Sequence, residues 1–140
     1  MKILVLAAAF AASCLVPSAL ASSPQSGALH ATKECSGFTG DAGSYCLITS
    51  SNVPAVAIGT KILYLQPGDL FTPAGSDVVL HPPGPGLNVA FGNCSLSVGR
   101  CTIWGGLGTL RGFHASVAVS YLGGEDWGWD GTYTLNSRTR

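Results

Sequence analysis

The side chains of this chain that could act as acids, bases or nucleophiles are few and far apart. His114 stands among serines in an alternating segment, His81 heads a proline-rich loop, and His30 lies near the N-terminus. The two glutamates are Glu34, which precedes a cysteine, and Glu125, which lies in a turn. The sequence contains no Gly-x-Ser-x-Gly turn of the kind that carries a hydrolase nucleophile. The residues therefore predict no catalytic group and weigh against an enzyme, without deciding the question.

The first residues indicate export. Met1 and Lys2 provide a short positive start, an apolar run over 3–16 follows, and Pro17 ends it. Ala19-Leu20-Ala21 has the small-x-small pattern that signal peptidase accepts. A membrane anchor is disfavoured because about 20 apolar residues are needed to span a bilayer. We expect a signal peptide over 1–21 and a protein secreted to the extracellular or periplasmic space.

The cysteines agree with an oxidising compartment. Cys14 falls in the predicted signal peptide, where the large aliphatic residue expected before a lipidated cysteine is missing. Cys35, Cys46, Cys94 and Cys101 remain, and four cysteines in a short exported domain imply two disulfides with three possible connectivities. Pairing Cys35 with Cys46 and Cys94 with Cys101 is favoured, because each pair brackets a glycine-bearing turn. The spacings are not those of zinc knuckles, so no metal and no cofactor is expected.

Charged residues make up only 10% of the chain, and the formal net charge is zero. The lysines and arginines are scattered and form no basic run. Nucleic acids and anionic membranes require clustered positive charge, so neither is expected as a partner after signal cleavage. The high apolar fraction also argues against disorder.

The aromatic residues of the last third define the candidate binding face. Segments 113–121 and 127–135 alternate apolar and polar residues and are joined by Gly123-Gly124, which is typical of two half-buried antiparallel strands. The period of two places these aromatic side chains on the inward face: Phe113, Tyr121, Trp127, Trp129 and Tyr133. We interpret them as candidate ligand-binding residues. A filled core is the default interpretation of such a cluster, and the wall of a ligand pocket is the alternative.

The remaining segments complete an all-β domain. Short apolar segments alternate with Gly- and Pro-rich turns, and no long helical pattern follows the signal peptide. Residues 22–32 are small and polar, which predicts a flexible leader, and 33–135 form the domain. The expected strands are 45–50, 61–66, 77–80, 87–91, 94–98, 101–104, 113–121 and 127–135. Eight antiparallel strands in one domain of this size predict a closed β-barrel or a small sandwich.

A resemblance favours the barrel. The segment CTIWGGLGTLRGFHA, followed by a long strand and WDGTY, resembles the allene oxide cyclase barrel-like group of secreted proteins. More loosely it is similar to the Gly-Gly-Thr-Gly-x-Phe segment of dirigent proteins, although Leu107 and Leu110 replace its threonine and phenylalanine. The resemblance covers roughly residues 94–133 and implies an eight-stranded antiparallel barrel. The glycines 105, 106, 108 and 112 would permit positive φ and close strand approach at a barrel corner.

The resemblance implies two kinds of activity. A cyclase of this group would need an inward glutamate beside bound water, and neither glutamate here has such a position. The expected function is therefore non-catalytic binding of a small apolar or aromatic ligand, or a structural extracellular module. An isomerase or cyclase acting on a hydrophobic substrate inside the barrel is the alternative. A third possibility is protein interaction through the loop 80–87, which would leave a solid barrel with an exposed apolar patch. The oligomeric state is left open.

Overall fold

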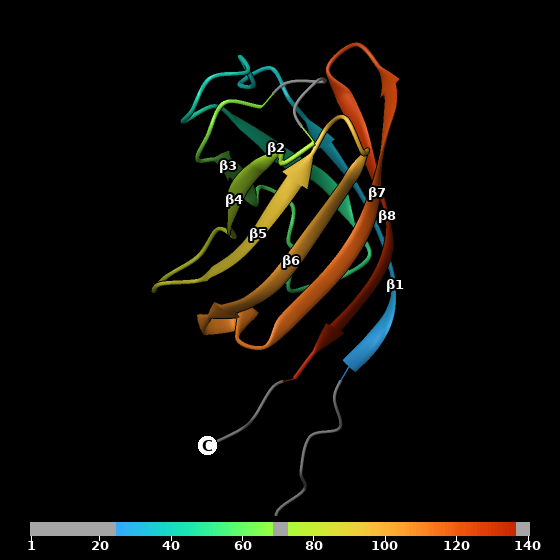
Figure 1. The fold of residues 1–140 in the computed structure, drawn as a ribbon. Coiled ribbons are helices and arrows are strands. Elements are labelled where there is room, and N and C mark those ends of the chain that lie inside the picture. Colours follow the sequence, from blue (N-terminus) through green and yellow to red (C-terminus); the bar gives the residue numbers. More distant parts are fainter. Residues whose placement is uncertain (1–24, 69–72, 137–140) are drawn as a thin grey trace, which may run out of the picture.

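Residues 25–68 and 73–136 are described by a computed structural model (Figure 1), so the expected signal peptide over 1–21 lies outside the described residues. The strands are β1 (Gln25–Glu34), β2 (Tyr45–Ser51), β3 (Lys61–Tyr64), β4 (Ser76–His81), β5 (Val89–Ser95), β6 (Arg100–Leu107), β7 (Phe113–Gly123) and β8 (Asp126–Leu135). A single 3-10 turn, η1 (Gly108–Leu110), joins β6 to β7. No helix in these two ranges is long and apolar enough to cross a membrane.

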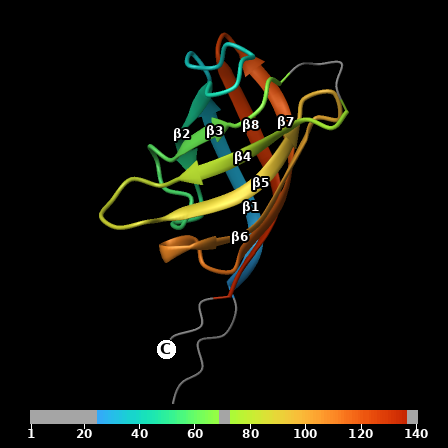
Figure 2. The same cartoon turned by 60° about the vertical axis from the view of Figure 1, so that its left-hand side comes forward.

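The eight strands form a closed antiparallel barrel, which confirms the expected fold class. Each strand pairs with the next along the chain, and β8 pairs with β1 to close the sheet. In both Figure 1 and Figure 2 the first strand runs beside the last. The contact is long, since all ten residues of β1 have partners in β8. Full closure leaves no unpaired sheet edge.

The expectation of a flexible leader over 22–32 is wrong from Gln25 onward. Residues 25–34 form β1, and the barrel therefore begins earlier than residue 33. Its inward positions are Leu29, Ala31 and Lys33, which alternate with exposed or half-buried neighbours. Small side chains and an inward lysine weaken the period-two signal, and this strand was missed for that reason.

The central strands differ in detail from their predicted limits. The two short strands expected at 87–91 and 94–98 are one strand, β5, and β6 continues to Leu107. A register shift between Ala90 and Gly92 lets β5 run past the glycines of β6. The close approach there requires glycine, because a Cβ on Gly106 would collide with the carbonyl oxygen of Val89. The positive φ expected at these glycines is confirmed for Gly105, Gly108 and Gly112, and the close strand approach is confirmed for Gly106.

Two disulfides link the predicted partners. Cys94 and Cys101 face each other directly across β5 and β6, as the expected hairpin requires. Cys35 and Cys46 close the loop between β1 and β2. Each bond closes a short loop, and in the chain-entropy model such a cross-link stabilises the fold by about 2–3 kcal/mol. The two bonds are consistent with an oxidising compartment.

The core occupies the lumen of the barrel. Every strand contributes at least one almost fully buried apolar side chain to it, and one from each is Leu29, Ile48, Ile62, Leu80, Ala90, Ile103, Val117 and Trp129. Alternate residues point outward, as the pleat of a strand demands. Ala31 is the cross-strand partner of Trp129, and large and small side chains together fill the interior.

Candidate functional site

The five aromatic residues expected to bind a ligand lie in two groups rather than along one wall. Phe113 and Tyr133 stack with ring centroids 6.1 Å apart, near the end of the barrel where β7 begins. Tyr121 and Trp127 meet at 5.1 Å near the opposite end, and Tyr121 is 60% exposed. Trp129 lies between the groups and is almost fully buried. The structure therefore brings these residues together as two pairs and a central core tryptophan.

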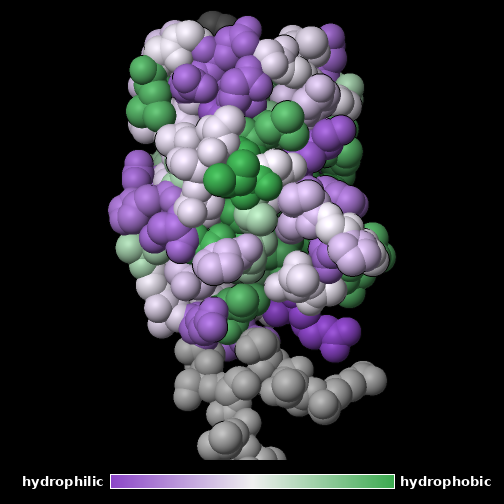
Figure 3. All heavy atoms as spheres, turned by 180° about the vertical axis from the view of Figure 1, so that it is seen from behind, coloured by the Kyte–Doolittle hydropathy of each residue, from purple (hydrophilic) through white to green (hydrophobic). Residues whose placement is uncertain are grey.

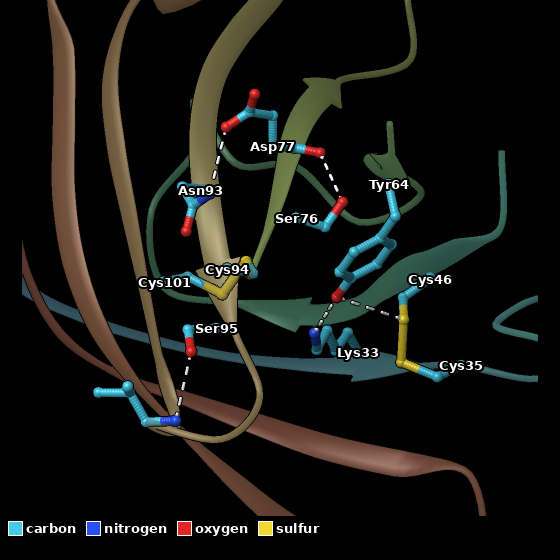
Figure 4. Close-up of a disulfide and its surroundings, with 11 residues drawn as sticks. Lys33, Cys35, Cys46, Tyr64, Ser76, Asp77, Asn93, Cys94, Ser95 and Cys101 are labelled. Carbon is cyan, nitrogen blue, oxygen red and sulfur yellow. Dashed lines mark hydrogen bonds between the residues drawn. A yellow bond between two sulfur atoms is a disulfide. The ribbon is translucent and has the colours of Figure 1, made fainter. Parts of the chain in front are cut away.

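A buried lysine in the lumen was missed from the sequence. Lys33 points inward from β1 with only 2% of its surface exposed. Its Nζ donates a hydrogen bond of 2.8 Å to the Tyr64 hydroxyl, and it lies 5.1 Å from the ring centroid of Trp129. Figure 4 shows Tyr64 between this amine and the Cys35–Cys46 disulfide, whose Cys46 sulfur is 4.0 Å from the hydroxyl. The sequence signal for this inward position is the alternation of Leu29, Ala31 and Lys33 on one face of a strand. It was missed because residues 22–32 were interpreted as a leader.

Burial controls the protonation of this pair. Removal from water lowers the pKa of Lys33 from its ordinary value to about 7, because a charged amine is poorly solvated in the lumen. The same desolvation raises the pKa of the Tyr64 phenol. No carboxylate hydrogen-bonds to the amine among the described residues, so the aromatic faces and the phenol are its only compensation. A neutral amine is therefore the stable form above neutral pH.

The cavity beside Lys33 in the lumen is too small for an organic ligand. The cavity beside Lys33 measures about 30 Å³, close to the volume that one water molecule occupies in the liquid. Its walls are Lys33, Cys35, Phe38, Cys46, Tyr64, Leu96 and Trp127. The Nε1 donor of Trp129 has no partner in the described part of the chain. The inward aromatic face had two interpretations, a filled core and the wall of a ligand pocket, and the filled core describes this interior.

A larger hollow lies on the outside of the barrel. It has a volume of about 410 Å³ and is lined by residues of β2, β3, β4 and the adjoining loops: Leu47, Gly59, Lys61, Leu63, Val79, His81 and Pro83. We call this hollow the outer groove. Figure 3 shows the face on which β2 and β3 are nearest to the viewer, and hydrophobic side chains gather in its middle with hydrophilic ones around them. Ligand sites in proteins typically measure about 300–1,000 Å³, which includes this volume.

The strand register explains why the outer groove is apolar. Leu63 pairs with Tyr45 on one side and with Val79 on the other, and Val79 pairs in turn with Phe91. These outward side chains form one continuous apolar row across four strands. The neighbouring row contains Leu47, Lys61 and His81.

A signal for this groove exists in the sequence. The runs Ile62 to Leu65 and Val78 to Leu80 are apolar at consecutive positions, so both faces of these strands are apolar. A strand with one solvated face would alternate instead. Only the last two strands were assigned inward and outward faces from their alternation, and this apolar outward surface was missed for that reason.

His30 and Asp130 form an exposed pair on the outer wall. The Nδ1 of His30 lies 2.7 Å from Oδ1 of Asp130, and each side chain is 62% exposed. Asn52 accepts a hydrogen bond from the backbone N–H of His30. Within the described residues no hydroxyl or thiol is hydrogen-bonded to the second ring nitrogen, so the pair lacks the nucleophile of a catalytic triad.

The glutamates lie outside the lumen. Glu34 accepts a hydrogen bond from the backbone of Ser36, and its pKa is lowered by hydrogen bonds to that residue. The pKa of Glu125 is raised, chiefly by its hydrogen bond with Glu34 and then by the neighbouring negative charges. Both carboxylates are solvated, and neither approaches the cavity beside Lys33. In the part of the chain that the structure describes, no group of three potential metal ligands occurs.

The fold and the site define a disulfide-bonded, closed β-barrel with a filled lumen and an apolar outer groove. Comparison with protein-family models, with curated proteins and with solved structures found no match to this chain. Its resemblance to the allene oxide cyclase barrel-like group therefore stays a prediction.

Proposed function

We propose that this protein is a secreted barrel that binds a small apolar or aromatic molecule in its outer groove without transforming it. The observation that carries the proposal is the contrast between two volumes: about 410 Å³ in the outer groove and about 30 Å³ in the lumen. Export is supported by the predicted signal peptide and by the two disulfides. The eight-stranded barrel also agrees with the resemblance to allene oxide cyclase-like proteins, which we retain as part of the proposal.

The energetics of the outer groove suit a weak binder. Leu47, Leu63 and Val79 expose a shared apolar surface to solvent, and covering the apolar part of the groove contributes about 2 kcal/mol from the side of the protein. Association entropy opposes this gain and the comparable gain from the ligand's own buried surface, so dissociation constants of about 1 mM or weaker are expected.

The alternative, an isomerase or cyclase, has one observation in its favour. Lys33 has a pKa of about 7, and a general base is most effective when its pKa lies near the working pH. A substrate would have to reach the amine through a cavity that holds one water, past Phe38, Leu96 and Trp127. Binding in the outer groove without a reaction does not require this cavity to open, and it is the function that we favour.

Methyl-resolved NMR with a panel of fatty acids, fatty alcohols and phenols tests the proposal. We expect the largest shifts at the methyl groups of Leu47, Leu63 and Val79, and small shifts in the lumen. Leu63→Asp should weaken binding about tenfold or more, because it places a charge within the apolar row. Leu122→Asp is the control for the added charge, since Leu122 is an exposed leucine of β7 that lies away from the groove.

Two results would contradict the proposal. Shifts concentrated at the buried methyl groups of Leu29, Ile48 and Val117 would return the ligand to the lumen and favour the alternative activity. No shift with any member of the panel would remove small-ligand binding and leave a structural or protein-interaction module. Unfolding midpoints of both variants must be compared first, so that loss of fold is not mistaken for loss of binding.

A further inference from the structure

We propose that the outer groove selects small amphiphilic carboxylates, with the carboxylate held by Lys61 and His81 and the apolar body lying over Leu63 and Val79. This inference rests on the proposed function, because it names the class of ligand that the same groove prefers. Its basis is the arrangement of polar and apolar side chains within the groove.

The two polar side chains of the groove are direct cross-strand neighbours. Lys61 of β3 pairs with His81 of β4, and both side chains point outward because Ile62 and Leu80 beside them are buried. Directly opposite residues in an antiparallel pair have Cβ atoms about 5 Å apart. A lysine ammonium and an imidazole N–H at this spacing can both donate to the two oxygens of one carboxylate.

The ammonium of Lys61 is placed over the apolar row rather than away from it. Its Nζ lies 4.5 Å from the ring centroid of Tyr45, the residue that pairs with Leu63. The aromatic face holds the amine through a cation–π contact. An anion bound by this amine therefore starts at the edge of the apolar row, and its hydrocarbon part can extend along Leu63 and Val79.

Nothing in the groove opposes a negative ligand. None of the seven lining residues is acidic, and among the described residues Lys61 makes no ion pair. The carboxylate that shares the outward face of β4 is Asp77, four residues before His81. It already accepts hydrogen bonds from the side chains of Gln66 and Asn93. The charge of Lys61 is thus available to a ligand.

The test compares an acid with the alcohol of equal chain length. Dissociation constants of decanoate and 1-decanol are measured by methyl NMR, below the concentrations at which either aggregates. We expect decanoate to bind about fivefold more tightly, the upper end of the effect of a solvent-exposed ion pair. Lys61→Met should remove this preference, so that the ratio of the two dissociation constants falls to about one. Lys61→Arg should retain it, and Arg111→Met, an exposed cation outside the groove, should not affect it.

Each outcome has a distinct meaning. Equal affinity of the unmodified protein for acid and alcohol overturns the inference while the proposed function stands. A preference that survives Lys61→Met overturns it as well, since another group must then hold the anion. Binding of neither compound in the groove is a failure of the proposed function itself. Association with anionic phospholipid vesicles but not with dissolved decanoate would replace a small ligand by a lipid surface and would also overturn the inference.

Discussion

At the scale of single residues, Lys33 is the least expected feature of the barrel. An amine in an apolar lumen is costly when charged, and here only a phenol and two aromatic rings compensate for the lost water. The lysine is tolerated because it can lose its proton: burial brings its pKa to about 7. The stability of the barrel must therefore respond to pH through this residue.

The free energy of unfolding should rise as the pH rises from about 7 to about 10. The pKa of Lys33 is about 7 in the folded protein and 10.5 when solvated, so within this window the unfolded chain binds the additional proton. The rise should be about 3–4 kcal/mol, given about 1.4 kcal/mol for each unit of difference. Tyr64 limits the window, because its raised pKa makes folding oppose phenol ionisation above about pH 10. Urea unfolding at a series of pH values measures the slope.

The matched variants are Lys33→Met and Lys61→Met. The first should flatten the dependence between about pH 7 and about pH 10, since methionine fills a similar volume and does not titrate. The second removes an exposed lysine and should leave the slope unchanged. An equal slope in the protein and in the Lys33 variant would show that this amine stays charged when folded.

At the scale of elements, the sequence pattern predicted β2, β3 and β4 as well as the last two strands, and it missed β1. β7 and β8 alternate clearly and were placed within two residues of their observed ends. β1 was missed because its inward residues after Leu29 are an alanine and a lysine. The disulfide pairs followed from turn chemistry alone, since each is local. The outer groove did not follow, because it depends on which outward residues the register places side by side.

Close approach of strands makes one glycine of β8 irreplaceable. Gly131 pairs with Leu29 of β1 and with Val117 of β7, and a Cβ at this position would collide with the carbonyl oxygen of Ser116. Gly131→Ala should therefore destabilise the barrel by about 1–3 kcal/mol, the usual cost of overpacking. Chemical denaturation measures this change. Gly27→Ala is the control, because its added Cβ would meet only the Tyr133 ring at 3.6 Å and should change stability by about 0.5 kcal/mol or less. Equal effects of the two substitutions would contradict the steric account.

At the scale of the whole molecule, the pairing of β1 with β8 closes the barrel and separates the small cavity in the lumen from the outer groove. A closed cylinder of eight strands has an interior just wide enough for side chains to fill, so the lumen becomes core. The apolar side chains that remain accessible on the wall include Leu47, Leu63 and Val79 of β2, β3 and β4, which line the outer groove. The proposed function therefore depends on closure of the barrel. Closure in turn depends on β1, whose small and polar residues 25–32 give no clear strand signal in the sequence.

Deletion of the first strand should abolish cooperative folding. A chain that begins at Lys33 keeps only two of the ten residues of β1, so β8 and β2 lose their shared neighbour and both become open edges. Leu29 and Ala31 are also removed from the core beside Trp129. We expect this chain to lack a sigmoidal urea transition and dispersed amide signals in NMR, whereas a chain that begins at Gln25 should retain both. If the shorter chain unfolds with the same midpoint and slope as the longer one, residues 25–32 contribute nothing to the barrel and β8 must close it in another way.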